Sequence, residues 1–244
     1  MYTWRFYRRW TGGGLNRFRI LAGESDLEIA AGDDCMEEAC VLLRRARLPI
    51  LRRIRRDPHF ETSLAPIQDT RGSEEPVASM LRASRLWDVG PMAAVAGAIS
   101  GFVGRGLAKR HGTVIVENGG DIYARGPEEL VLRLYAGESS PFRGSVDLAV
   151  EASDGIGICT SSGTVGPSLS LGRADAVTVV ASDPAVADAA ATSIANRVGS
   201  QAEVDAVLKE AAKNRSILGA LACCGGRLAV YGLRLLQPIA GGCS

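Results

Sequence analysis

The sequence lacks the signals that identify most membrane and secreted proteins. No apolar run reaches the roughly 18 residues that a transmembrane helix needs. The first ten residues are basic and aromatic, but they contain no long apolar region and no cleavage site, so they do not resemble a signal peptide. We therefore expect a cytoplasmic protein without a membrane partner.

Disulfide and zinc patterns are also scarce. The six cysteines include no CxxC pair, and the adjacent Cys223 and Cys224 have poor geometry for an ordinary disulfide. We interpret the cysteines as reduced and mostly buried. Zinc is the alternative, but only His59 and His111 could add imidazole ligands, and neither is close in the sequence.

Motifs of the commonest enzyme classes are missing as well. The sequence has no GxGxxG after a first strand, no Walker loop, no HExxH and no GxSxG. Its net charge of +1 gives no reason to expect a nucleic-acid partner. What remains is an ordinary globular composition, with 46% hydrophobic and 23% charged residues.

Apolar segments of strand length, often bounded by turn residues, are frequent along the chain. Residues 17–22 and 27–30 form a plausible hairpin around a turn at residues 23–26. Aromatic residues between positions 2 and 7 suggest a further strand. Other expected strands cover residues 113–116, 130–135, 145–150, 155–159, 176–181 and 227–231.

Helical patterns lie between these strands. Residues 37–56 have helical spacing with a break or kink at Pro49, and residues 77–87 and 201–213 are also predicted helices. Asp183 and Pro184 form a favourable helix start. Residues 90–103 are apolar on almost every side, which predicts a buried helix.

The predicted fold is α+β, with a mostly antiparallel or mixed sheet packed on this buried helix. A chain of 244 residues is long enough for a single domain, 1–244, or for two closely packed subdomains. The helix at 37–56 also carries many arginines on its polar side. They form either an anion-binding face or a solvated surface, and we favour the solvated surface.

Three polar turns or pairs are candidates for a binding site. Asn118, Gly119, Gly120 and Asp121 follow a strand, where two glycines permit close approach by a ligand or simply form a hairpin turn. A hydroxyl-rich turn follows another strand, at Thr160, Ser161, Ser162, Gly163 and Thr164.

Asp188 and Thr192 are the third candidate. They are four residues apart on one helix, so they share a face and could offer oxygen ligands to Mg²⁺. The alternative is a packing face of small residues with an exposed aspartate.

Together, the stretches NGGDI, TSSG and DAAAT resemble the ordered motifs of the ApbE family, the FAD:protein FMN transferases. The chain is more similar to an ApbE-like family whose members share its ENGGDIY, GICTSSGT and ADAVTVVA stretches over nearly the full length. This resemblance implies an ApbE-like fold and a site for a flavin nucleotide, FAD or FMN, with Mg²⁺.

The resemblance also implies individual roles. Flavin-binding residues would be Asn118, Gly119, Gly120 and Asp121 from the first turn, and Thr160, Ser161, Ser162, Gly163 and Thr164 from the second. Mg²⁺ would be held by Asp188, Thr192 and the carbonyl of Ala93, whose segment resembles the family's Gly-Gly-Ile-Ala-Lys-Gly. The implied partner is a small nucleotide, and a homo-oligomer is compatible with the sequence.

Departures from the family concern the chemistry. The transferases carry His-x-x-Asp-Pro after the TSG turn, whereas residues 165–173 here read VGPSLSLGR, and Ala94 stands where the family has lysine. FMN transfer needs a proton acceptor, so we expect little transfer, and the sequence identifies no catalytic residue.

Three hypotheses follow. The protein binds a flavin with Mg²⁺ without established chemistry. Alternatively, it is an active flavin transferase or FAD pyrophosphatase with a non-standard base. The third hypothesis is that the pocket of the protein binds another small metabolite or is only structural.

Overall fold

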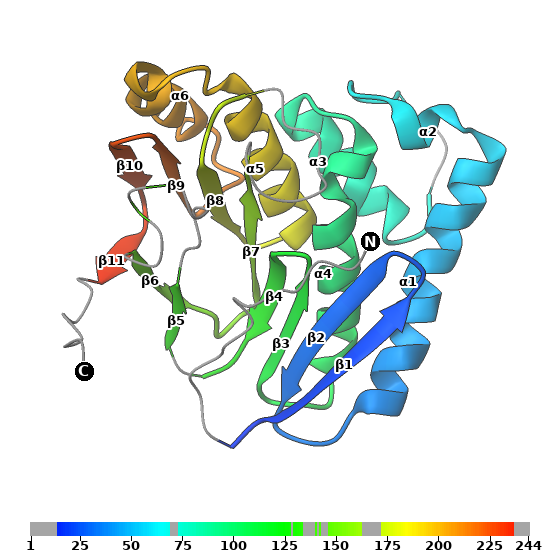
Figure 1. Ribbon diagram of the computed structural model, residues 1–244. Helices are drawn as coiled ribbons and strands as arrows, with labels where there is room; N and C mark the ends of the chain where they lie inside the picture. Colours follow the sequence, from blue (N-terminus) through cyan, green and yellow to red (C-terminus); the bar gives the residue numbers. More distant parts are fainter. Residues whose placement is uncertain are drawn as a thin grey trace.

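A computed structural model describes residues 14–68, 73–127, 129–133, 140, 142, 146–162 and 172–236. In these residues, helices cover one face of an eight-stranded sheet, and a three-stranded sheet lies on the other (Figure 1). The predicted α+β class is therefore confirmed. The expected strand at residues 2–7 lies outside the described residues.

Every strand pairing in the large sheet is antiparallel, and the order is β1-β2-β3-β4-β7-β8-β9-β10. Its strands are β1 (Asn16–Ala22), β2 (Ser25–Ala31), β3 (Val114–Asn118), β4 (Asp121–Arg125), β7 (Ile156–Ser161), β8 (Ala176–Ala181), β9 (Gly219–Cys224) and β10 (Arg227–Tyr231). The small sheet has the order β11 (Arg234–Leu236), β6 (Asp147–Glu151) and β5 (Glu129–Arg133).

The helices form the other layer. They are α1 (Met36–Arg56), α2 (His59–Thr62), α3 (Val77–Trp87), the 3-10 helix η1 (Pro91–Ala94), α4 (Val95–Leu107), α5 (Pro184–Arg197), the 3-10 helix η2 (Gln201–Glu203) and α6 (Val204–Ala211). Helix α5 packs against β7, β8, α3, α4 and η1, so it occupies the centre of this layer.

The helix predicted at residues 90–103 is two elements rather than one. Ala94 leaves the helical conformation (φ −119°, ψ 7°), which ends η1 and starts α4. Helix α4 then continues to Leu107 because Gly104 and Gly106 leave room for the side chains of Tyr123 and Leu42. The predicted burial is correct: Ile99 and Val103 are buried, and Val95 is half-buried.

Local signals placed the start of α5 correctly. Asp183 accepts a hydrogen bond from the backbone N–H of Ala185 at 3.1 Å, and Pro184 is the first helical residue. The turn between β1 and β2 is shorter than predicted. Asp26 belongs to β2, and its carboxylate forms an ion pair with the side chain of Arg19 on β1 at 2.7 Å.

Other differences have simple causes. The helix predicted at residues 201–213 consists of η2 followed by α6, which ends at Ala211. Leu51, an apolar residue of α1, is 45% exposed. Strand β9 was missed because it is buried throughout and therefore shows no alternation of polar and apolar residues.

The five described cysteines are free thiols, and all except Cys40 are buried. In the described ranges, no group of three His, Cys, Asp or Glu side chains is arranged to hold a metal, so the zinc alternative gains no support there. No single described helix is long and apolar enough to cross a membrane. The bent pair formed by α3 and residues 91–107 passes on length and composition, but it turns by 108°.

Candidate functional site

The Asn118–Asp121 segment is the tight turn that joins β3 to β4. Asn118 and Asp121 are partners across the hairpin, and both turn glycines have positive φ (72° and 104°). Two central residues with positive φ are typical of the hairpin turns that twist with the sheet. The two interpretations of this sequence, a hairpin turn and a turn that a ligand can approach closely, are therefore compatible.

Two hydrogen bonds fix this turn. The N–H of Gly120 donates to the Glu117 carboxylate at 2.6 Å, and Glu117 itself is almost completely buried. The side-chain amide of Asn118 donates to the carbonyl of Ala96 at 3.2 Å. The turn is thereby held against the first residues of α4.

The second candidate turn begins beside the first. Strand β7 pairs with β4 so that Cys159 lies opposite Asp121, and Gly120 approaches the carbonyl of Thr160. The hydroxyl of Thr160 is paired with that of Thr178 at 2.9 Å, on the sheet face opposite to Cys159, because side chains alternate along a strand.

The remaining residues of the second turn are only partly described. Ser161 and Ser162 are half-buried, and the Ser162 hydroxyl donates to the carbonyl of Asp175 at 2.6 Å. Gly163 and Thr164 lie outside the described residues. That both turns line one cleft stays a prediction.

Asp188 reaches the same region from α5. Its carboxylate accepts the backbone N–H of Gly97 at 2.9 Å and also that of Ala96. These N–H groups belong to the first turn of α4, which has no helical partners for them and carries the positive end of the helix dipole. Asp188 therefore has a structural role in addition to any ligand-binding role.

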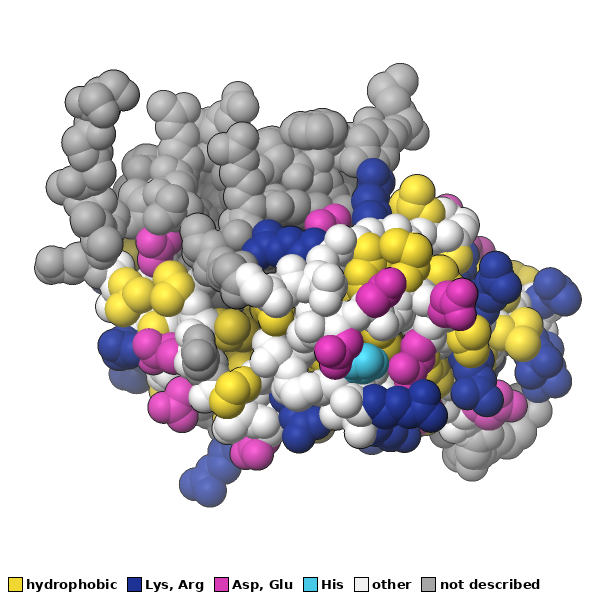
Figure 2. Space-filling view, turned by 90° about the horizontal axis from the view of Figure 1, so that it is seen from below, with side chains coloured by type: hydrophobic (Ala, Val, Ile, Leu, Met, Phe, Trp, Pro, Cys, Tyr) yellow, Lys and Arg dark blue, Asp and Glu magenta, His cyan; other side chains and the backbone are white. Residues whose placement is uncertain are grey.

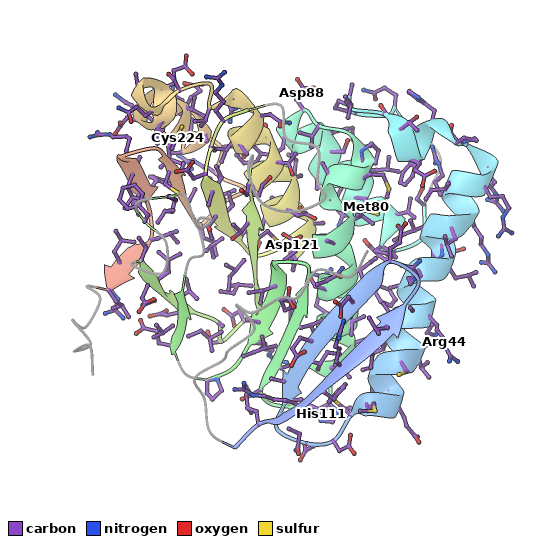
Figure 3. All side chains as sticks on the ribbon, viewed as in Figure 1. Arg44, Met80, Asp88, His111, Asp121 and Cys224 are labelled. Carbon is purple, nitrogen blue, oxygen red and sulfur yellow. The ribbon has the colours of Figure 1, made fainter. Side chains whose placement is uncertain are left out.

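The charges of two carboxylates, Asp121 and Asp188, interact here. Burial, followed by the charge of Asp188, raises the pKa of Asp121 well above its ordinary value, although hydrogen bonds from Cys159 and Thr160 oppose this. Burial raises the pKa of Asp188 to about 7. Among the described residues, no lysine or arginine forms an ion pair with either aspartate. Asp121 lies at the end of the hairpin, next to α4 (Figure 3).

The other predicted metal ligands lie on neighbouring elements. Thr192 is half-buried one helical turn after Asp188, and Ala93 is half-buried in η1. Helix α5 packs directly against η1. The described structure therefore brings the two elements that carry these residues together, whereas joint coordination of one ion by the three residues stays a prediction.

Cys159 and Glu117 were not identified from the sequence. Burial and the charges of Asp121 and Asp188 raise the pKa of the Cys159 thiol well above its ordinary value, and its Sγ donates to the carbonyl of Pro184 at 3.4 Å. The only available signal was that each residue directly adjoins a candidate turn. Their inward orientation depends on strand register, which the sequence did not supply.

The raised pKa values predict an unusual pH dependence of stability. Between the ordinary value of 3.8 and about 7, the folded protein holds protons on Asp188 that the unfolded chain releases. Stability therefore falls as pH rises through this window. We expect urea unfolding in chelator to show a loss of roughly 1–3 kcal/mol. Asp188→Asn removes the carboxyl that titrates in this window and should flatten the curve, whereas a wild-type curve that rises with pH would contradict the assignment.

Comparison with known proteins identifies the family of this chain. A family model described as AbpE bacteria matches residues 8–226. The UPF0280 protein of Methanosarcina acetivorans is 38% identical over 213 residues, which cover 86% of this chain and 83% of the relative. The UPF0280 protein of Methanothrix thermoacetophila is 42% identical over 182 residues, which cover 72% and 74%.

A solved structure shows the same fold at lower identity. The flavinyl transferase ApbE of Pseudomonas stutzeri, in its apo form, superimposes with a TM-score of 0.58 and 15% identity, covering 89% of this chain and 93% of that one. At this identity the likeness concerns the fold alone. The family match spans most of the sequence, and the chain therefore belongs to this ApbE-like family, which includes the UPF0280 proteins.

Proposed function

We propose that the protein binds a flavin nucleotide, FAD or FMN, together with Mg²⁺, between the Asn118–Asp121 turn, the turn that begins at Thr160, and α5. The observation that carries the proposal is the pair Asp121 and Asp188, two carboxylates whose charges interact, whose pKa values are raised and which form no ion pair with a lysine or arginine among the described residues. A divalent cation would remove this repulsion, and phosphate oxygens of a nucleotide would complete its coordination.

The residues present fit such an ion. Mg²⁺ prefers oxygen ligands, and Asp188, Thr192 and the carbonyl of Ala93 would supply a carboxylate, a hydroxyl and a carbonyl. Asp121 would add a second negative charge on the opposite side. When bound, the ion would supply charge neutralisation for the phosphates.

The flavin nucleotide would approach the turns. Gly119 and Gly120 have no side chains, so their backbone leaves room for a ligand. Asn118 and Asp121 flank them, while Thr160 would contribute through its backbone, because its hydroxyl is held by Thr178. Ser161, Ser162, Gly163 and Thr164 would form the other wall.

A second candidate function is an active flavin transferase or FAD pyrophosphatase. It is favoured by Asp121, because a buried carboxylate with a raised pKa is the usual form of a tuned general base. The absent His-x-x-Asp-Pro motif opposes it. An assay for covalent flavin on a threonine-bearing acceptor, or for FMN released from FAD, separates binding from catalysis.

Calorimetric titration tests the proposal. We expect Mg²⁺ to increase FAD affinity by roughly tenfold or more, because without the ion the two carboxylates repel the pyrophosphate. Mg²⁺ alone should bind weakly, since nucleotide oxygens supply much of the site. Equal FAD affinity with Mg²⁺ and with chelator would reject the metal site, and no FAD or FMN binding would reject the proposal.

A further inference from the structure

Helix α1 carries an unusual set of unpaired charges on its outer side. In the part of the chain that the structure describes, five exposed arginines there form no hydrogen bond or ion pair, and we call them the arginine face: Arg44, Arg45, Arg52, Arg55 and Arg56. By contrast, Arg47 donates to the hydroxyl of Ser25, and Arg53 pairs with Asp57. No aspartate or glutamate occurs between residues 39 and 56, so the acidic residues of the helix, Glu37 and Glu38, are confined to its first turn.

Large aliphatic side chains are interleaved with these arginines. Val41 is 52% exposed, Leu48 is 48% exposed and Leu51 is 45% exposed. Helical spacing places them among the arginines, because residues three, four and seven positions apart share a side. The opposite side of α1 packs inward through Ala39, Leu43, Ala46 and Ile50.

The figures place this surface at the edge of the molecule. Helix α1 runs along the outside of the fold, with β1, α2 and α4 on its inner side (Figure 1). Arg44 points away from the protein (Figure 3). Seen from below, basic side chains with hydrophobic ones among them gather on the side where α1 lies (Figure 2). A helix of 21 residues is about 31 Å long, so its outer side could lie flat on an extended partner.

We infer that this outer side of α1 binds an anionic phospholipid surface. Guanidinium groups donate paired hydrogen bonds to phosphate, and aliphatic side chains enter the boundary between headgroups and acyl chains. A nucleic acid would satisfy the arginines but would leave Val41, Leu48 and Leu51 in water. The interleaving of the two kinds of side chain therefore favours lipid.

The composition of the first ten residues agrees with this partner. They contain Arg5, Arg8 and Arg9 together with two of the three tryptophans of the chain, Trp4 and Trp10. Arginine with tryptophan is a combination typical of segments at a membrane interface.

The sequence alone favoured a solvated surface here and no membrane partner. Two facts that only the structure provides alter this interpretation. One is the exposure of all three aliphatic side chains, including Leu51. The other is that none of the five arginines has a partner.

Sedimentation with lipid vesicles tests the inference on the full chain. We expect binding to vesicles of phosphatidylcholine mixed with phosphatidylglycerol, no binding to phosphatidylcholine alone, and release as salt screens the charges. The double variant Leu48→Gln, Arg52→Gln should bind roughly tenfold more weakly. Its matched control changes an exposed leucine and arginine on α3, in Leu86→Gln, Arg85→Gln, and should bind like the wild type.

Several outcomes would overturn the inference. Equal binding to neutral vesicles, or none to anionic ones, would exclude the lipid surface. If the α1 variant bound vesicles as well as the wild type, with its fold verified by thermal unfolding, the lipid-binding site would have to lie outside α1. Binding to DNA but not to vesicles, or a change of oligomeric state in the α1 variant, would replace lipid with nucleic acid or with a second copy.

Discussion

Asp188→Asn is expected to remove the Mg²⁺ dependence of FAD binding that we propose and to leave the protein folded. The asparagine oxygen can still accept the N–H of Gly97, which lies 2.9 Å from the present carboxylate, so the first turn of α4 keeps its partner. The negative charge that a cation would need is lost. With Mg²⁺ present we expect FAD affinity to fall by roughly tenfold or more, or about 1.4 kcal/mol for each factor of ten.

Four calorimetric titrations decide this result: wild type and Asp188→Asn, each with Mg²⁺ and with chelator. Asp188→Ala provides a harsher comparison, because it loses both the charge and the acceptor for Gly97. It should also abolish the Mg²⁺ effect, and thermal unfolding should show lower stability than for Asp188→Asn. A Mg²⁺ effect that persists in Asp188→Asn would place the ion elsewhere, and FAD binding by the wild type without any Mg²⁺ effect would leave a flavin site but no metal.

Gly97→Ala is expected to disrupt both stability and the site. A Cβ at this position would meet the Pro184 carbonyl and would lie 2.8 Å from the Asp188 Cβ, so α4 and α5 would have to separate. Forced overpacking of this kind costs about 1–3 kcal/mol, and more where the obstacle is backbone, as here. Separation of the helices would also pull the N–H of Gly97 away from Asp188.

Urea unfolding measures the stability change, and FAD titration with Mg²⁺ measures the change at the site. Gly112→Ala is the matched control, because nothing lies within 4 Å of its added Cβ and its φ is not positive. That variant should unfold like the wild type. If Gly97→Ala were equally stable and bound FAD normally, the close contact between α4 and α5 would not support the site.

Elements marked by strong local signals were predictable from the sequence. Helix α5 begins where Asp183 and Pro184 indicated, because capping and a fixed φ act within a few residues. Strand β8 also agrees with the predicted residues 176–181, since a run of β-branched residues bounded by polar ones has few alternatives. The family motifs identified the two turns by resemblance.

Features that depend on distant contacts were not predictable. The position of Cys159 opposite Asp121 follows from the register of β4 and β7, whose residues lie more than thirty positions apart in the chain. Asp188 is both the hydrogen-bond acceptor of the Gly97 N–H and a candidate metal ligand. This double role could be recognised only once the first turn of α4 was known to lie against α5. The raised pKa of Asp121 results from burial and from a neighbour 67 positions away, and sequence spacing contains neither quantity.

The chain is anchored on either side of residues 163–171 by contacts that are separate from those of the acidic pair. The Ser162 hydroxyl is held by the Asp175 carbonyl, and the Arg173 N–H donates to the Val198 carbonyl at 2.7 Å. Neither of these two hydrogen bonds involves Asp121, Asp188 or the first turn of α4. A substitution that breaks one of these anchors should therefore leave the hydrogen bond between Asp188 and Gly97 in place.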